Sequence, residues 1–363
     1  MSADADLLIL GGGIAGLTTA LAAAERQLSV ILIDSPRPGA ASRAAAGMLA
    51  PSAEKVPREL RDAALGARDF YPAFVDDLRE RTGVEVPLDR RGILELAPEG
   101  EAERLRANMP DGSQWLDEHA LRELEPALEG HPGALLHPMD GAVDNVALMD
   151  ALERAVERVP TIKRIAAEIL SVDSDQPSAL TRTRGRVFGT RLVLAAGAWA
   201  GGIPGLPRAL PVRPVRGQLL RLAQSPVRHV TYGGGGYLVP RGDTVLIGAT
   251  SEEAGFENET SLAGLAALRH IAARAVPSLG AAFVVDHWAG LRPMSLDGHP
   301  ILGPDPDSPA LVYACGYSRN GILFAPWAAA RLADVLVGHA VDGLAPFRID
   351  RPSLRALSPD LRG

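Results

Sequence analysis

Four residues near the N-terminus have the types and spacing needed to bind a dinucleotide. Three glycines form the pattern Gly11-x-Gly13-x-x-Gly16, and Asp34 ends the next apolar run of the chain. Gly11 allows a tight turn, Gly13 has no Cβ to keep the backbone away from a pyrophosphate, and Gly16 lets a helix pack closely. The free N–H groups at the start of that helix suit phosphates. Asp34 is expected to accept hydrogen bonds from ribose hydroxyls and to repel a 2′-phosphate.

The elements around these residues have the order that such a site requires. Residues 7–10 form a short apolar strand, residues 17–27 an Ala-rich helix, and residues 28–33 a second strand. This order favours a dinucleotide site over a structural turn in an unrelated α/β protein. The motif alone fits both FAD and NAD, and its position at the N-terminus of a long chain is associated with FAD.

Composition and length exclude several classes of protein. The chain has 363 residues, 47% of them hydrophobic and 22% charged, which is typical of a globular protein of about two domains. A net charge of −7 argues against nucleic acid as a partner. No run approaches the ~18–20 apolar residues of a membrane span. The single cysteine, Cys315, excludes an intramolecular disulfide and a cysteine-rich metal site. We therefore expect a cytoplasmic protein with no metal.

The rest of the chain alternates between two kinds of segment. Helices are expected at residues 59–81, 145–158, 261–276 and 321–337, and an apolar strand at 186–195 leads into a turn of small residues. Residues 212–248 alternate as antiparallel strands do, and the run Gly233–Gly236 reads as a mobile hairpin connection.

This alternation predicts an α/β fold in which a Rossmann-like nucleotide-binding domain is interleaved with an antiparallel-sheet substrate domain. The nucleotide-binding domain is assigned residues 1–85, 140–211 and 286–363. The substrate-binding domain is assigned residues 86–139 and 212–285.

Five further motifs resemble those of one enzyme family. They are Ser42-Arg43-Ala44-Ala45-Ala46-Gly47-Met48-Leu49-Ala50-Pro51, Tyr237-x-Val239-Pro240-Arg241, Gly290-Leu291-Arg292-Pro293, Asp297-Gly298-x-Pro300-x-x-Gly303 and Arg319-Asn320-Gly321-Ile322-Leu323. In this order, over essentially the whole length, they resemble the D-amino-acid-oxidase-like family of FAD enzymes, and within it the glycine oxidases of thiamine biosynthesis.

The resemblance implies an activity and three residues that serve it. Such enzymes oxidise the amine carbon of an amino acid by hydride transfer to FAD, and oxygen is then reduced to peroxide. By motif, Arg292 matches the arginine that pairs with the substrate carboxylate, Tyr237 a tyrosine that hydrogen-bonds it, and Arg319 a second arginine beside the substrate. A planar guanidinium suits this task because it donates two parallel bonds to a carboxylate.

The resemblance also implies non-covalent FAD, because the linkage context of the related sarcosine oxidases is missing, and a homo-oligomer, with a tetramer possible. The expected FAD-binding residues are Gly11, Gly13, Ile14, Ala15, Gly16, Asp34, Ser35, Ala41, Ser42, Ala46, Gly47, Met48, Ile169, Ala196, Gly197, Trp199, Tyr317, Ser318, Asn320, Gly321, Ile322 and Leu323.

Departures from the family pattern concern the substrate pocket, which is assigned Met48, Ala50, Gly235 and Ser251. Gly235 and Ser251 stand where larger side chains are usual, and Ala50 replaces a glycine, so a roomier pocket is expected. Sarcosine and small D-amino acids could then compete with glycine. Two alternatives stay open: a dehydrogenase of the same fold that uses another electron acceptor, and a flavin-binding protein without activity.

Overall fold

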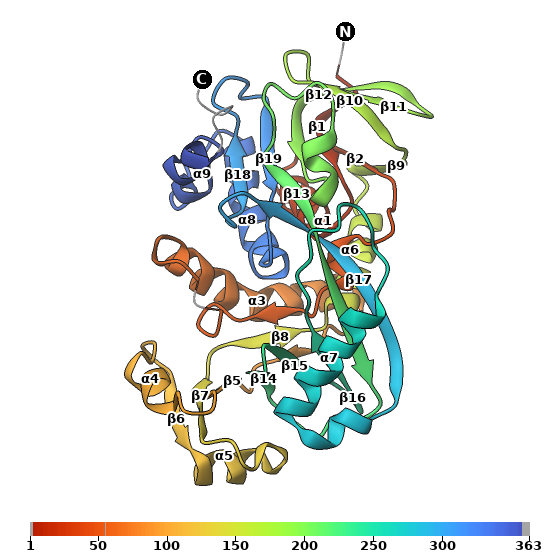
Figure 1. The fold of residues 1–363 in the computed structure, drawn as a ribbon. Helices are drawn as coiled ribbons and strands as arrows, with labels where there is room; N and C mark the ends of the chain where they lie inside the picture. The colour runs from red at the N-terminus through yellow and green to blue at the C-terminus, as the bar shows by residue number, and fades with distance from the viewer. Residues whose placement is uncertain (1–2, 55, 358–363) are drawn as a thin grey trace.

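The computed structural model describes residues 3–54 and 56–357, whose strands form two large sheets, one above the other in Figure 1. The first sheet contains β1 (Ala5–Leu10), β2 (Val30–Asp34), β9 (Ile162–Ala166), β10 (Ile169–Asp173), β11 (Ser178–Thr181), β12 (Gly185–Leu194), β18 (Ile301–Pro304) and β19 (Leu311–Cys315). The second contains β5 (Ile93–Leu96), β6 (Gln114–Asp117), β7 (Gly133–His137), β13 (Val212–Leu222), β14 (Val230–Gly233), β15 (Gly236–Arg241), β16 (Thr244–Gly248) and β17 (Val284–Ser295). A small sheet joins β3 (Met48–Leu49), β4 (Leu88–Asp89) and β8 (Gly141–Val143).

Helices pack mainly around the first sheet (Figure 1). They are α1 (Ile14–Glu25), α2 (Ala41–Ala44), α3 (Arg61–Thr82), α4 (Ala102–Ala107), α5 (Glu118–Leu124), α6 (Asn145–Glu157), α7 (Leu262–Ala275), α8 (Gly321–Leu336) and α9 (Pro352–Leu357). The expected helices at residues 59–81, 145–158, 261–276 and 321–337 are confirmed as α3, α6, α7 and α8.

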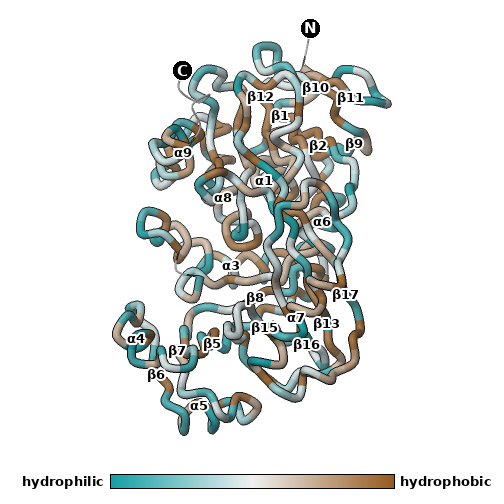
Figure 2. Tube along the Cα trace, in the orientation of Figure 1, coloured by the Kyte–Doolittle hydropathy of each residue, from teal (hydrophilic) through white to brown (hydrophobic). Residues whose placement is uncertain are grey.

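The centre of the first sheet is a parallel array. β1 lies between β2 and β12, and β19 runs parallel to β12 on its other side. All four strands are apolar because both faces of this part of the sheet are buried: one face packs against the helices, and the other packs in a second cluster that includes Val172 of β10 and Ala179 of β11. Helices α1, α3, α6 and α8 share one large buried cluster with the strands of this array. Figure 2 shows hydrophobic residues concentrated in β1, β2 and β12.

The second sheet is mostly antiparallel, as expected for the two insertions. The hairpin at Gly233–Gly236 is confirmed: Gly234 and Gly235 have φ angles of 64° and 94°, which form the two-residue turn between β14 and β15. β14 also pairs with β5 in parallel, so residues from both insertions form one sheet. The division into domains stays a prediction; β17 runs through its boundary at residue 286 and pairs with β13 along its length.

The described residues contain neither a helix that could span a membrane nor a cluster of side chains that could hold a metal ion. No helix among them has the length and apolar character needed to cross a membrane. Within residues 3–54 and 56–357, no group of His, Cys, Asp and Glu side chains is arranged to hold a metal ion.

The turn between β17 and β18 is tied to the C-terminal segment by a buried ion pair. Asp297 accepts hydrogen bonds from Arg351 Nε at 2.7 Å, Arg351 Nη2 at 2.6 Å and Ser353 Oγ at 2.7 Å. Only 5% of Arg351 is exposed. Burial alone would raise the pKa of Asp297, but the hydrogen bonds from Arg351 and Ser353 outweigh it and lower the pKa to about 2. The Asp297 motif therefore has a structural task.

This ion pair predicts an acid-sensitive contribution to stability. The pKa of Asp297 is about 2 in the folded chain against 3.8 without these contacts. The ionised Asp297 therefore contributes ~2 kcal/mol to the free energy of unfolding above pH 4, and this contribution is lost as the pH falls toward 2. Asp297→Asn should destabilise the protein by about 3–5 kcal/mol at pH 6, because it leaves Arg351 buried and unpaired. In urea unfolding, the loss of stability caused by Asp297→Asn should be about 1 kcal/mol smaller at pH 3 than at pH 6. The exposed control Asp62→Asn should stay within about 0.5 kcal/mol of wild type. An equal Asp297→Asn deficit at both pH values would contradict the assignment.

Candidate active site

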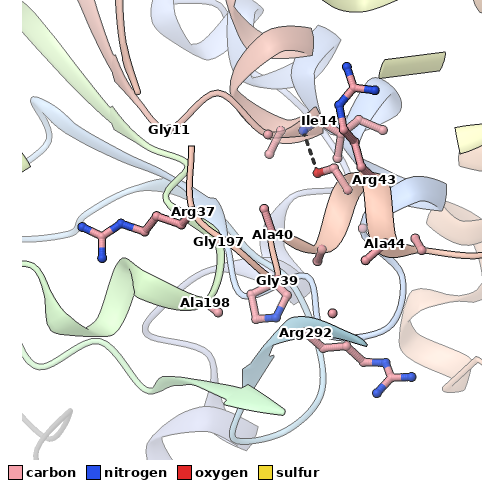
Figure 3. Close-up of a pocket in the computed structure, with 18 of the residues that line it drawn as sticks. Gly11, Ile14, Arg37, Gly39, Ala40, Arg43, Ala44, Gly197, Ala198 and Arg292 are labelled. Carbon is pink, nitrogen blue, oxygen red and sulfur yellow. Dashed lines mark hydrogen bonds between the residues drawn. The ribbon is translucent and has the colours of Figure 1, made fainter. Parts of the chain in front are cut away.

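A cavity of about 1050 Å³ extends from the glycine-rich turn to the second sheet. One end is lined by residues 11–15, and the other by Tyr237, Arg292 and Arg319. In Figure 3, Gly11 and Ile14 lie at one end of the view and Arg292 at the other, with Gly39 and Ala40 between them. Residues expected to bind a dinucleotide and residues expected to bind a substrate therefore share one cavity.

The glycines at the first end are required by close contacts. Gly11 has a φ angle of 116°, and a Cβ on it would lie 2.4 Å from the carbonyl oxygen of Ala195 at the end of β12. A Cβ on Gly16 would lie 1.8 Å from the oxygen of Gly11, so helix α1 packs directly against the turn. Both contacts match the tight turn and the close helix packing expected of these positions.

Two side chains from other segments hold the turn in place. Asp34, at the end of β2, accepts a hydrogen bond from the N–H of Gly12 at 2.9 Å. Ser42, in α2, accepts one from the N–H of Ile14 at 3.0 Å, drawn as a dashed line in Figure 3. Ser42 thus caps α1 in place of Gly13, which has no side chain to do so.

The middle of the cavity fits a large planar group. Gly197, with a φ angle of 55°, has no atom within 4 Å of the place a Cβ would occupy, so it leaves open space after β12. Tyr317 lines the cavity, and its hydroxyl is one of two buried side-chain polar atoms without a partner among the described residues. Small side chains at 40, 41, 44, 45 and 46 line the wall between them. Open space and a wall of small residues suit a bound flavin.

An aromatic contact bridges the two sheets beside this space. Trp199, in the turn after β12, stacks on Phe256 with ring centroids 5.7 Å apart, and the guanidinium of Arg37 lies 5.5 Å from the Trp199 ring. Phe256 belongs to the connection between β16 and α7. This connection of the second sheet therefore contacts the nucleotide end of the cavity directly.

At the second end, Arg292 is held flat against the neighbouring strand. It lies on β17, and a Cβ on Gly217 of β13 would come within 2.2 Å of its Nη1 and 2.3 Å of its Nη2. Nη1 also donates a hydrogen bond to the carbonyl oxygen of Thr250 at 3.0 Å. Burial lowers the pKa of Arg292, yet a guanidinium stays charged at any physiological pH. The contact with Gly217 fixes both the place and the plane of this cation.

Tyr237 is fixed in a similar way. It pairs across the ladder with Gly248, and a Cβ there would lie 2.3 Å from the Tyr237 ring. Burial raises the pKa of Tyr237 to about 12, so its hydroxyl remains a neutral donor. Its ring lies 5.8 Å from that of Tyr232.

Two residues at this end were missed by sequence reasoning. Glu54 lines the cavity and accepts a hydrogen bond from the hydroxyl of Tyr232 at 2.7 Å. Burial raises the pKa of Glu54; the Tyr232 hydrogen bond and the charges of Arg319 and Arg292 act against that rise. No motif marks Glu54, because a carboxylate in a polar segment gains meaning only when folding places it beside these groups.

The segment that carries Met48 and Glu54 is anchored on both sides. Arg241 donates hydrogen bonds to the carbonyl oxygens of Ala46 and Val143, each at 2.8 Å. Asp140 accepts from the N–H groups of Ser52 at 2.8 Å and Ala53 at 2.9 Å. The loop is therefore positioned by side chains from the second sheet and from the β7–β8 connection.

Most of the residues assigned from sequence lie together in this cavity. Arg292, Tyr237, Arg319 and Met48 line it, as do 18 further assigned positions: Gly11, Gly13, Ile14, Ala15, Asp34, Ser35, Ala41, Ser42, Ala46, Gly47, Ile169, Ala196, Gly197, Trp199, Tyr317, Ser318, Gly321 and Ile322. Six assigned residues lie outside the lining: Gly16, Asn320, Leu323, Ala50, Gly235 and Ser251. Ala50 is buried, Gly235 forms the tip of the hairpin turn, and Ser251 is exposed. These last three positions do not line the cavity, and the roomier pocket expected from them stays a prediction.

Comparisons with known proteins agree with this geometry. Residues 6–335 match the family described as FAD dependent oxidoreductase. The glycine oxidase of Geobacillus kaustophilus is 35% identical over 366 residues, which cover 95% of this chain and 97% of that protein. The bifunctional protein ThiO/ThiG of Synechocystis sp. is 36% identical over 95% of this chain, which spans about half (53%) of that relative's length.

Solved structures give the same result. The crystal structure of the Geobacillus kaustophilus glycine oxidase superposes with a TM-score of 0.87 at 33% identity, and the match covers 95% of this chain and 98% of that chain. The glycine oxidase from Bacillus cereus superposes with a TM-score of 0.86 at 26% identity, and the match covers 97% of this chain and all of that one (100%). A cavity that joins a dinucleotide-type turn to a fixed guanidinium, together with these matches, shows that the chain is a flavoenzyme and belongs to the family of FAD-dependent oxidoreductases.

Proposed function

We propose that this enzyme oxidises glycine and similarly small amino acids and amines, such as sarcosine and small D-amino acids, at the carbon that bears the amine. The observation that carries this proposal is the Arg292 guanidinium, held against Gly217 and beside Tyr237 in the cavity that fits the flavin. Relatives named glycine oxidase that align over nearly the whole chain support glycine as a substrate.

The chain's own residues position the substrate in this proposal. Arg292 binds the substrate carboxylate through two parallel hydrogen bonds, which fix both its position and its angle. Tyr237, a neutral donor, adds a third hydrogen bond, and Arg319 contributes a second positive charge to the same end. With the carboxylate fixed, the Cα of a small substrate is held at this end of the cavity that fits the flavin. Catalysis then depends mainly on this orientation.

The chemistry that bound FAD would supply is the acceptance of a hydride equivalent from the substrate and the reduction of oxygen to hydrogen peroxide. The residues that would hold it are those of the glycine-rich turn, Asp34, Ser42 and the small-residue wall. We infer non-covalent attachment: Cys315 is buried in β19, and burial raises the pKa of its thiol to about 12, which leaves almost no reactive thiolate. The imine formed from glycine is proposed to supply the thiazole of thiamine. A cytoplasmic location and a homo-oligomer also stay predictions.

An anaerobic screen of flavin reduction tests the proposed function. Glycine and sarcosine should bleach the flavin absorbance of the purified holoenzyme, whereas bulky L-amino acids, which lie outside the proposed substrate class, should not. Under air the same substrates should yield hydrogen peroxide. Bleaching without peroxide would indicate a dehydrogenase with another acceptor, and no bleaching by any amine or amino acid would indicate a flavin-binding protein without this activity.

The carboxylate contact predicts the effect of removing the guanidinium. Arg292→Ala should lose about 2–5 kcal/mol of substrate binding, seen mostly as a raised KM for glycine. The control Arg213→Ala removes an exposed arginine of β13 that pairs with Glu253, and it should behave as wild type. Turnover of glycine by Arg292→Ala close to that of wild type would show that the assigned contact is wrong.

The contact between Gly217 of β13 and the Arg292 guanidinium predicts the effect of a second, smaller substitution. Gly217→Ala should push the Arg292 guanidinium away from its place and raise KM by between about 10-fold and 100-fold, without loss of fold. Gly66→Ala, in α3, is the matched control, because its new Cβ would lie 3.4 Å from Trp327, an ordinary contact. Steady-state kinetics and thermal unfolding of both variants check this. A Gly217→Ala enzyme with wild-type KM would refute the positioning role.

A further inference from the structure

One carboxylate at the substrate end has no part in binding the substrate carboxylate. Glu54 lines the cavity, and Tyr232 on β14 donates a hydrogen bond to its Oε1 at 2.7 Å. A negative charge at this place repels the carboxylate of an amino acid, so it works against the contact that Arg292 provides. Its presence beside two arginines needs another explanation.

The charged and titratable groups around Glu54 come from every side of this end. Tyr232 and Tyr237 lie on β14 and β15, Arg292 lies on β17, Arg319 precedes α8, and Asp140 follows β7. Asp140 accepts from Ser52, Ala53 and Arg68, which engage it in holding the loop. Among the described residues, Glu54 is therefore the carboxylate that lines the cavity beside both guanidiniums.

The proposed reaction needs a proton acceptor at this place. A free amino acid is a zwitterion at neutral pH, because the pKa of an aliphatic ammonium lies well above 7. An ammonium nitrogen has no lone pair, so it cannot form the C=N bond as hydride leaves the neighbouring carbon. One ammonium proton must be removed first, and the cavity already holds two positive guanidiniums.

We propose that Glu54 binds the ammonium group of the substrate and accepts one of its protons, while Arg292 holds the carboxylate. This inference rests on the proposed function. In the step, one N–H bond breaks and an O–H bond forms on Glu54, and the electron pair of the broken bond stays on nitrogen. That pair forms the C=N bond when hydride leaves Cα. The proton on Glu54 returns to solvent after the product leaves.

The electrostatics of the cavity favour this transfer. It replaces a negative and a positive charge by two neutral groups, which lowers the cost of enclosing them away from water. Burial raises the pKa of Glu54 toward that of the ammonium, which makes the transfer less unfavourable. The Tyr232 hydrogen bond and the two guanidiniums oppose this rise and favour the ionised carboxylate that must receive the proton.

Glu54→Gln tests the proposal, because the amide keeps the shape and can still accept from Tyr232. At pH 7 the variant should lose about 100-fold or more in kcat/KM for glycine. It must bind the neutral amine from solution, whose fraction rises about tenfold per pH unit below the ammonium pKa. The deficit should therefore shrink steeply up to pH 10. Glu59→Gln, an exposed acid five positions further along, is the control and should follow the wild-type profile.

Acetate binding provides a readout independent of turnover. Acetate carries the carboxylate without the amine, and its binding is measured by the change in flavin absorbance. Glu54→Gln should bind acetate as tightly as wild type or more tightly, because a negative charge has been removed. A deficit in kcat/KM that is constant from pH 7 to pH 10, or weakened acetate binding, would overturn the proposal in favour of a structural role. If wild type and Glu54→Gln turn over glycine equally at pH 7, only the role of Glu54 fails. If no amine reduces the wild-type flavin, the proposed function itself fails.

Discussion

The contact between the Arg292 guanidinium and the bare Cα of Gly217 is the interaction on which the substrate end of this enzyme depends. β13 and β17 pair in one register from Val212 with Ser295 to Arg221 with Asp286, so their relative position is fixed on both sides of Gly217 and Arg292. A long, flexible side chain would otherwise have many rotamers in an open cavity. Resting on the neighbouring strand, it presents its plane in one orientation before any ligand arrives.

Few charged side chains surround the Arg292 guanidinium. Arg292 and Arg319 supply two positive charges and Glu54 supplies one negative charge, so these three side chains together have a net charge of +1. The tyrosines contribute neutral donors because burial keeps them protonated. A zwitterion meets complementary charge at both of its ends. A simple carboxylic acid meets a repulsive carboxylate, and a simple amine lacks the group that the guanidinium binds.

The parts of the molecule that sequence reasoning found are those specified by local patterns. The glycine spacing predicted the first turn, and apolar periodicity predicted α3, α6, α7 and α8. Arg292, Tyr237 and Arg319 came from a resemblance, and the structure places them in one cavity. Glu54 and Tyr232 were missed, because their meaning comes from a contact between segments 178 residues apart in the chain. The parallel pairing of β14 with β5, and the continuation of β17 past residue 286, are likewise long-range choices that no local pattern encodes.

The order of the strands in the first sheet has a consequence for how the enzyme is made. The glycine-rich turn follows β1 near the start of the chain, but α1 packs against α8, and β19 completes the centre of the sheet beside β12. During synthesis on the ribosome, the first turn is therefore exposed without its cover until β19 and α8 have emerged. A dinucleotide fold assembled from such distant segments cannot mature from its first strands alone, and the flavin site is completed only once β19 and α8 are available. Contacts between such distant segments also slow folding, which lengthens the time during which chaperones can bind the unfinished apoprotein.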